Sequence, residues 1–383
     1  AESAWTKAFV AGAADNRTAD VMAGIYGRAY TPELQRTYYD LLTEHHIPPD
    51  DLYLSSPRPL SDYAYLQSVG QPSMGLADVS SLPFEGGDGC ANFSEAYVEA
   101  MLDELRPTVA ALEEAGIPLN ATYVYGFDEA SPDCEPGVRQ LFGAAKAAFP
   151  GIRTVAVLNW PEQTGAPMPA DLPLDVWCLQ YEEHDADAAD AWLRGGNNNN
   201  IDVESREYWL YHCIEPSGSA YLNTFIERPL VQTRLLFWYG ASLPQVSGWL
   251  YYAVDLWDTG CAANPEAHDA GLERLEPASA LTTWNAGNCI WWPTYDFWAN
   301  GDGQYIYPGP DGPVPTVRLA NVRDGLEDVE LFRRLPEATA AELLGRLVRG
   351  PTNFTEDPSL LEATRRAAAA ALVEHLAGGA TPR

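Results

Sequence analysis

Strand-like apolar segments alternate with amphipathic helical segments through the first two thirds of this chain, and this alternation constrains the fold most. It is typical of a parallel α/β sheet. About eight strand–helix units over roughly 250 residues match a (β/α)₈ barrel. The expected strands are residues 5–11, 52–55, 120–127, 153–160, 176–181, 207–213 and 248–254, with a less clear one near 63–66.

Helix-start signals place the first helices. Thr31, Pro32 and Glu33 suit an N-cap, a first helical position and a first turn, and predict a helix to about residue 46. A second helix is expected from Ser94, where Pro107 should kink or split it. Further helices are expected at 137–149 and 220–239, and after the barrel near 316–335, 339–349 and 358–378. We therefore expect a TIM-like catalytic barrel over residues 1–315 with a C-terminal helical extension, 316–383, packed on it as part of the same domain.

Two adjacent carboxylates, Asp128 and Glu129, close the strand-like run that begins at Asn120. Neighbouring side chains of a strand point to opposite faces, so both acids can face one site only if the chain turns there. Glycosidases usually carry two carboxylates on different elements, on either side of the scissile bond. An adjacent pair suits an arrangement in which one acid protonates the leaving group while the other holds the substrate's own acetamide as nucleophile. An ordinary acidic turn is the alternative interpretation.

Polar and aromatic residues also follow the other expected strands, at 159–160, 181–183, 212–215 and 255–258. In a barrel these ends would surround Asp128 and Glu129, because barrel enzymes keep their chemistry at the carboxyl ends of the strands. Residues arranged in this way offer hydrogen bonds and the faces of aromatic side chains to a sugar. His212 is more typical of a packed, hydrogen-bonded histidine, and the acidic cluster 182–185 lacks metal-ligand spacing. We therefore predict no metal and no cofactor.

The net charge of −31, from 54 acidic and 23 basic residues, argues against a nucleic-acid partner, since phosphate contacts need Lys and Arg. No stretch approaches the roughly 18 apolar residues of a membrane span, so no membrane insertion is expected. The first residues lack an initiator Met and a signal-like apolar region, which suggests a processed form or fragment. Four Asn-X-Ser/Thr sequons hint at a secreted or lysosome-like location.

The six cysteines show no CxxC motif. Cys178 and Cys213 lie in apolar strand-like runs and are expected to be buried free thiols. The other four lie in loop-like stretches, where disulfides are plausible in an oxidising compartment. The predicted pairs are Cys90–Cys134, which follow neighbouring strands, and Cys261–Cys289, which bracket one loop.

Six runs in the second half carry a resemblance to a known family. They are Tyr208-Trp-Leu-Tyr-His-Cys-Ile-Glu-Pro216, Asn223-Thr-Phe-Ile-Glu-Arg-Pro-Leu230, Arg234-Leu-Leu-Phe-Trp238, Gly248-Trp-Leu-Tyr-Tyr252, Gly301-Asp-Gly-Gln-Tyr-Ile-Tyr-Pro-Gly309 and Arg318-Leu-Ala-Asn-Val-Arg-Asp-Gly-Leu-Glu-Asp328. Together they resemble the catalytic domain of glycoside hydrolase family 123 and its relatives, from about residue 8 to 335. The resemblance implies a (β/α)₈ barrel, usually preceded by a β-sandwich domain, whereas this sequence starts at the barrel.

The resemblance also implies an activity, the retaining exo-hydrolysis of β-linked N-acetylgalactosamine with help from the substrate's acetamide. The family's Asp-Glu pair matches Asp128 and Glu129. Glu129 would protonate the glycosidic oxygen and then activate water, and Asp128 would bind the acetamide N–H. A tyrosine typically binds the acetamide oxygen, and Tyr181, Tyr211 and Tyr251 are candidates. The full set of expected substrate-binding residues is Trp160, Tyr181, Tyr211, Trp249, Tyr251, Asp255 and Trp257.

Two other functions remain open. One is a glycosidase of different specificity, or a sugar lyase, on the same barrel. The other is a carbohydrate-binding barrel without catalysis, although binding alone needs no proton donor. A glycan is the partner in every case, and the sequence leaves the oligomeric state open.

Overall fold

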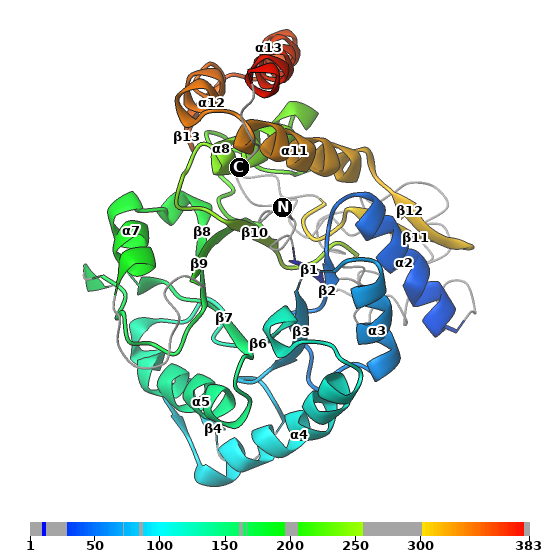
Figure 1. Ribbon diagram of the computed structural model, residues 1–383, viewed down its shortest axis with the longest axis vertical. Helices are drawn as coiled ribbons and strands as arrows, with labels where there is room; N and C mark the ends of the chain where they lie inside the picture. The colour runs from blue at the N-terminus through cyan, green and yellow to red at the C-terminus, as the bar shows by residue number, and fades with distance from the viewer. Residues whose placement is uncertain are drawn as a thin grey trace, which may run out of the picture.

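The computed structural model describes residues 10–12, 29–71, 73–83, 87–160, 164–165, 167–195, 206–255 and 301–378. An all-parallel sheet curls round on itself in Figure 1, with helices on its outer side. The strand order is β2-β1-β10-β9-β8-β7-β6-β3. The strands are β1 Val10–Gly12, β2 Pro49–Asp50, β3 Met74–Asp78, β6 Thr122–Tyr125, β7 Arg153–Val157, β8 Val176–Gln180, β9 Glu207–Tyr211 and β10 Gly248–Tyr251.

The two ends of this sheet, β2 and β3, are not paired as strands, so the structure shows an α/β fold with a curled parallel sheet and does not confirm a full (β/α)₈ barrel. Two hydrogen bonds nevertheless cross the gap. The backbone N–H of Asp78 donates to the carbonyl oxygen of Leu54 (2.8 Å), and the N–H of Gly75 donates to Asp50 Oδ2 (2.8 Å). The fully buried Asp50 also accepts from Tyr123 Oη (2.8 Å), so one carboxylate links β2, β3 and β6.

Helices between the strands cover the outer face of the sheet (Figure 1). One apolar core fills the space between the sheet and these helices, and a second lies inside the curl. Val157, Cys178 and Trp209 belong to the inner core and are paired in register across β7, β8 and β9. The helices are α2 Pro32–Glu44, α3 Leu60–Ser68, α4 Glu95–Glu114, α5 Glu135–Ala148, α7 Ala186–Arg194 and α8 Leu230–Ala241.

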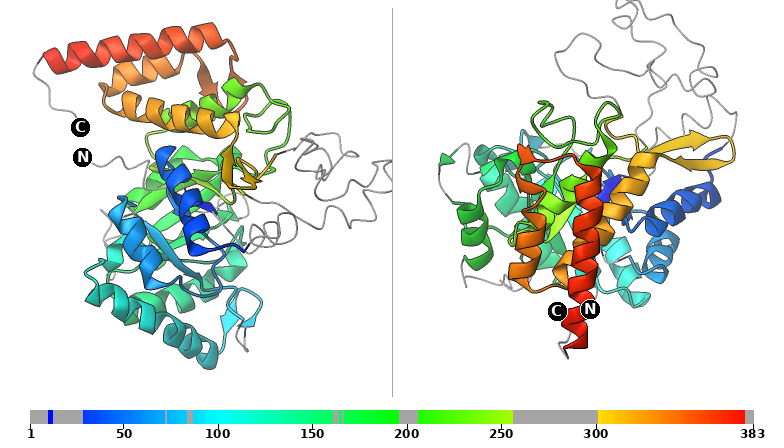
Figure 2. Two further views of the ribbon diagram at one scale, coloured as in Figure 1. Left: turned by 90° about the vertical axis from the view of Figure 1, so that its right-hand side faces the viewer. Right: turned by 90° about the horizontal axis from the view of Figure 1, so that it is seen from above.

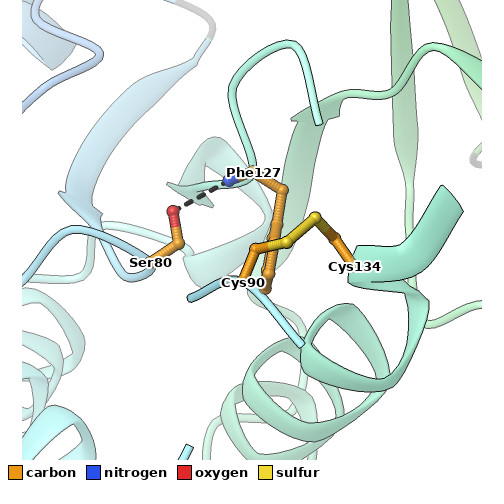
Figure 3. The surroundings of a disulfide bond; sticks show 4 residues. All are labelled: Ser80, Cys90, Phe127 and Cys134. Carbon is orange, nitrogen blue, oxygen red and sulfur yellow. Dashed lines mark hydrogen bonds between the residues drawn. A yellow bond between two sulfur atoms is a disulfide. The ribbon is translucent and has the colours of Figure 1, made fainter. Parts of the chain in front are cut away.

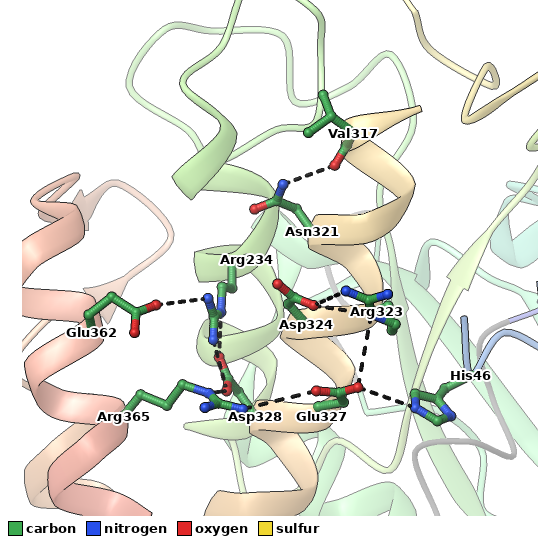
Figure 4. Close-up of polar contacts among 10 residues, drawn as sticks. All are labelled: His46, Arg234, Val317, Asn321, Arg323, Asp324, Glu327, Asp328, Glu362 and Arg365. Carbon is green, nitrogen blue, oxygen red and sulfur yellow. Dashed lines mark hydrogen bonds and ion pairs between the residues drawn. The ribbon is translucent and has the colours of Figure 1, made fainter. Parts of the chain in front are cut away.

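Three helices after the sheet, α11 Val317–Arg333, α12 Glu337–Leu344 and α13 Pro358–Ala377, pack together on one side of the molecule (Figure 2). The buried carboxylate of Asp328 on α11 binds Arg234 of α8 at 2.6 Å and Arg365 of α13 at 2.7 Å (Figure 4). It also accepts from Trp238 Nε1 of α8 at 2.8 Å. The helices expected near 316–335 and 358–378 are confirmed within about two residues. The helix expected at 339–349 is present as α12 but ends at Leu344, and Val348 and Arg349 belong to a short strand instead. Apolar packing holds the three helices as well, through the buried side chains of Leu335, Leu343, Leu344 and Leu347.

Short two-stranded ribbons complete the described structure: β4 Gly87–Asp88 with β5 Asn92–Phe93, β11 Ile306–Gly309 with β12 Gly312–Pro315, and β13 Val348–Gly350 with β14 Asn353–Phe354. Among the described residues, no helix is both long enough and apolar enough to cross a membrane.

Four sequence expectations need correction. The unclear strand near 63–66 lies in helix α3, where Tyr63 and Leu66 are both buried; a spacing of three suits one helix face, and short apolar runs do not separate the two states. The second strand is β2, before the expected 52–55, and the third is β3. Helix α8 begins only after Pro229, because the residue before a proline disfavours helix. Helix α4 runs unbroken through Pro107, so the helix is not split there, and the expected kink stays a prediction.

Candidate active site at the carboxyl ends of the strands

A bulge after β6 presents the two adjacent acids. Tyr125 pairs with Val155 of β7, and the next pairing joins Ala130 to Leu158. Between these two pairings the segment after β6 advances five residues (125 to 130), while the segment after β7 advances three (155 to 158). Two extra residues therefore bulge out of the hydrogen-bonded ladder.

The backbone of this bulge takes left-handed conformations that side-chain-bearing residues rarely adopt, with φ of +61° at Phe127 and +48° at Glu129. Asp128 and Glu129 are exposed as a result, while Phe127 stays buried. This is the turn that two neighbouring acids need in order to face the same side.

A hydrogen-bond relay supports the bulge from β3. The N–H of Phe127 donates to Ser80 Oγ (2.9 Å; Figure 3), and that hydroxyl donates to Asp78 Oδ1 (3.0 Å). Burial raises the pKa of the Asp78 carboxyl. Gly126 lies so close to Ser80 that an added Cβ would be 3.2 Å from its Oγ, which favours glycine there.

The predicted disulfide between Cys90 and Cys134 is present beside the bulge (Figure 3). Cys134 ends η2 (Pro132–Cys134), the first turn after the acids, and is buried. The disulfide therefore ties the start of α5 to the β4–β5 ribbon. Gly137 allows this close approach, because a Cβ there would overlap the carbonyl oxygen of Cys90. The second predicted pair, Cys261–Cys289, falls outside the described residues.

Three tyrosine hydroxyls hold the two carboxylates separately. Tyr125 Oη donates to Asp128 Oδ1 (2.6 Å), and Tyr53 Oη donates to Asp128 Oδ2 (3.1 Å). Tyr211, at the end of β9, donates to Glu129 Oε1 (2.7 Å). Burial, reinforced by this bond to Glu129, raises the pKa of the Tyr211 hydroxyl, which keeps it a neutral donor.

A third carboxylate, Asp302, lies at the same end of the sheet. Its two oxygens accept from Tyr251 Oη (3.0 Å) and Tyr252 Oη (2.9 Å), and Tyr251 Oη accepts from the N–H of Gly303 (2.6 Å). Burial raises the pKa of Asp302 to about 6. Burial raises the pKa of the Cys213 thiol to about 12, and the negative charges of Asp302 and Glu129 contribute to this rise.

Both cysteines expected to be free are free, and Cys178 is fully buried. Cys213, however, is only partly buried and lies outside β9. The strand ends two residues earlier, at Tyr211, so the chain has already left the sheet there.

Four of the other expected substrate-binding residues lie in the outer core. Tyr181 and Trp249 are fully buried and face the outer core, where Tyr181 Oη donates to the carbonyl oxygen of Leu222 (2.5 Å). Tyr251 faces the same core and reaches Asp302. Trp160 also packs in the outer core. Asp255 is buried and bridges to Gln304, and Trp257 lies outside the described residues.

His212 is a packed histidine, as the sequence indicated. Its Nδ1 accepts from Trp249 Nε1 (2.9 Å), and its Nε2 lies 3.2 Å from Thr224 Oγ1 and 3.3 Å from Tyr305 Oη. Burial lowers its pKa to about 3, so the ring stays neutral. Within the described residues, no three His, Cys, Asp or Glu side chains are grouped so that they could hold a metal ion.

Sequence reasoning missed Tyr53, Tyr125, Tyr252 and Asp302. Two of them could have been proposed from the sequence. Tyr125 precedes Asp128 by three residues in the same strand-like run, and Asp302 belongs to the run 301–309 that carries the family resemblance. Tyr53 comes from an unrelated loop after β2, and only the three-dimensional structure brings it to Asp128.

Residues 184–335 match the family model described as the glycoside hydrolase 123 catalytic domain. This segment includes Tyr211 and Asp302 but begins after Asp128 and Glu129. No curated protein matches the chain.

Proposed function

We propose that this chain is a glycoside hydrolase of the family whose catalytic-domain model matches residues 184–335. We propose further that it releases β-linked N-acetylgalactosamine with retention, using the substrate's acetamide as nucleophile. The observation that carries the proposal is the bulge, which exposes two adjacent acids with separate tyrosine partners. The carboxylates of ordinary retaining glycosidases come from opposite sides of the scissile bond. An adjacent pair instead suits a mechanism in which one acid orients the acetamide and the other protonates the leaving group.

In this proposal Asp128 orients the acetamide. Tyr125 fixes one of its oxygens from the buried side, and the other is held by the longer bond to Tyr53, whose side chain is 46% exposed. The acetamide N–H takes the place of Tyr53 on Oδ2. The acetamide carbonyl oxygen then points at the anomeric carbon, attacks it and forms an oxazolinium ion, while Asp128 stabilises the positive charge.

Glu129 moves the proton. It donates to the glycosidic oxygen as the bond to the anomeric carbon breaks, and then removes a proton from the water that opens the oxazolinium ring. Two inversions at the anomeric carbon give net retention. Tyr211, bonded to Glu129 Oε1, leaves Oε2 to face the leaving group. Such proton transfer typically contributes 10²–10⁴-fold.

The surrounding architecture is part of the proposal. We propose that the sheet closes as a (β/α)₈ barrel, which the hydrogen bond between Asp78 and Leu54 supports, with a barrel over 1–315 and a helical extension over 316–383. The disulfide favours a secreted or lysosome-like location, because disulfides persist in oxidising compartments.

Asp302 is the observation that favours a second candidate, a conventional two-carboxylate glycosidase. Asp302 is a partly buried acid with a raised pKa at the same end of the sheet as Glu129, and in this candidate mechanism it has the role of second carboxylate. A panel of 4-nitrophenyl β-glycosides of N-acetylgalactosamine, N-acetylglucosamine, galactose and glucose separates the two. Substrate assistance requires the acetamido sugars and inhibition by a GalNAc-thiazoline, whereas a covalent glycosyl adduct on Asp302 or any other carboxylate would overturn it.

Two variants test the roles of the acids. Glu129→Gln should lower kcat/KM by about 10²–10⁴-fold on substrates with poor leaving groups and spare activated aryl glycosides, which need little protonation. Asp128→Asn should slow both substrate types by the same factor, because it weakens the nucleophile itself. Glu113→Gln, on the exposed side of α4, is the matched control and should leave both rates unchanged. Equal losses across leaving groups for Glu129→Gln would contradict its role as acid.

A further inference from the structure

Two side-chain amides, each with one buried atom that has no partner among the described residues, lie in the same layer as Tyr211. Gln180, the last residue of β8, is paired in register with Tyr211, so both side chains lie on the same face of the sheet. One layer below, Val157, Cys178 and Trp209 are in register within the inner core. Asn159 lies two residues beyond Val157 and continues this layer from β7, with its N–H bonded to the carbonyl oxygen of Ala130, the residue after Glu129 (3.1 Å).

Both amides leave a buried atom unsatisfied. Asn159 Oδ1 and Gln180 Nε2 are inaccessible to solvent and have no hydrogen-bond partner in the described structure. Buried polar atoms are almost always paired, and leaving one unpaired destabilises the fold. An exception beside a candidate active site therefore indicates a group that a ligand satisfies. Here one atom is an acceptor and the other a donor.

We propose that Asn159 and Gln180 bind one ring hydroxyl of the sugar whose glycosidic bond faces Glu129. A hydroxyl donates one hydrogen bond and accepts others, so a single hydroxyl can donate to Asn159 Oδ1 and accept from Gln180 Nε2. The acetamide is already assigned to Asp128, which leaves the ring hydroxyls for this pair. The inference rests on the proposed function for the position of the sugar, and makes the two amides determinants of sugar specificity.

The test combines variants that lack one or both amides with substrates that lack one ring hydroxyl. Wild-type protein, Asn159→Ala, Gln180→Leu and the double variant are assayed on 4-nitrophenyl β-N-acetylgalactosaminide and its 3-, 4- and 6-deoxy analogues. Binding of the corresponding methyl glycosides, and of methyl β-galactoside and β-glucoside, is measured by calorimetry. Gln245→Leu is the matched control, because Gln245 also has an unpaired buried atom, Oε1, but precedes β10 at the opposite end of the sheet.

We expect one deoxy substrate to lose about tenfold to a hundredfold in kcat/KM with wild-type protein, since each of the two hydrogen bonds of the missing hydroxyl contributes roughly 0.5–1.5 kcal/mol. The same deoxy substrate should lose nothing further with Asn159→Ala or Gln180→Leu. Gln180→Leu should also unfold at the same or a higher temperature than wild type, because it removes an unpaired buried amide. A purely structural amide would instead lower the unfolding temperature and show no coupling to any hydroxyl.

The outcomes separate this inference from the proposed function. If wild type hydrolyses the acetamido substrates but no hydroxyl couples to either amide, the hydroxyl site is wrong and the proposed function stands. If wild type hydrolyses none of them but binds a methyl glycoside with the predicted coupling, the function is wrong and the site stands. Absence of binding to every glycoside tested would overturn the hydroxyl site as well.

Discussion

Asp302 should make the stability of the protein depend on pH in the opposite direction from most acids. Burial raises the pKa of its carboxyl from 3.8 to about 6, so the folded state binds this proton more tightly than the unfolded chain does. Its contribution is complete below about pH 4 and is lost as the pH rises through 6, on the order of 3 kcal/mol in total. Asp302→Asn should remove this dependence in urea unfolding between pH 4 and 7.

Asp171 provides a control of opposite sign. Hydrogen bonds from Arg139 hold the pKa of its exposed carboxyl below the usual value, so its small contribution is lost as the pH falls. Asp171→Asn should therefore weaken the acid-side loss of stability and leave the change near pH 6 intact. Identical slopes for wild type and Asp302→Asn between pH 4 and 6 would show that Asp302 is not the group responsible.

At the same scale, side-chain alternation explains which aromatic predictions reach the acids. In β9 the odd-numbered Trp209 and Tyr211 face inward, so Tyr211 meets Glu129. In β10 the inward residue is Leu250, and Trp249 and Tyr251 face the helices. Alternation along a strand tells which of its residues share a face, but the sequence alone does not tell which face points inward. Which tyrosine meets which acid depends on packing that no local pattern records.

At the scale of elements, the disulfide beside the acidic bulge should contribute both to stability and to the geometry of the site. Cys90 and Cys134 are separated by 44 residues, for which the chain-entropy model gives about 4 kcal/mol. Replacing both by Ala should lower the free energy of unfolding by this order, measured in guanidinium. It should also reduce kcat, because Cys134 ends η2, the first turn after the bulge.

Cys178→Ala is the comparison variant. Its thiol is buried and free, so its removal leaves only a small cavity, with a cost of roughly 1 kcal/mol. A double variant no less stable than Cys178→Ala would contradict the structural role of the disulfide.

The elements also show where sequence reasoning reaches its limit. Helices with a clear N-cap, such as those starting after Thr31 and Ser94, were placed within about two residues. The bulge at Asp128 could be expected only as a turn, because its two extra residues are defined by the register with β7. The buried link from Asp50 to Gly75 and Tyr123 was not foreseeable, since its partners lie far apart in the chain.

At the scale of the whole molecule, the candidate site is assembled from most of the chain. Tyr53, Asp128, Tyr211 and Asp302 come from four loops or strand ends, and the first two precede the segment that matches the family model. That segment also holds α11, which supports the site indirectly. Arg318 of α11 is buried and donates to the carbonyl oxygens of Thr224 and Gly301, at 3.1 and 2.6 Å, next to Asp302.

The ion-pair cluster around Asp328 should hold the C-terminal helices without taking part in catalysis. Asp328→Ala would leave the largely buried Arg234 (Figure 4) and the N–H of Trp238 without their shared acceptor. Breaking a buried pair in this way costs about 3–5 kcal/mol. Asp324→Ala, which removes a partly exposed pair with Arg323 on the same helix, should cost less than about 1 kcal/mol. Both variants should keep the wild-type kcat/KM well below their unfolding transitions, because neither residue contacts the acids. A loss of activity in folded Asp328→Ala, with stability unchanged, would place α11 in the active site rather than behind it.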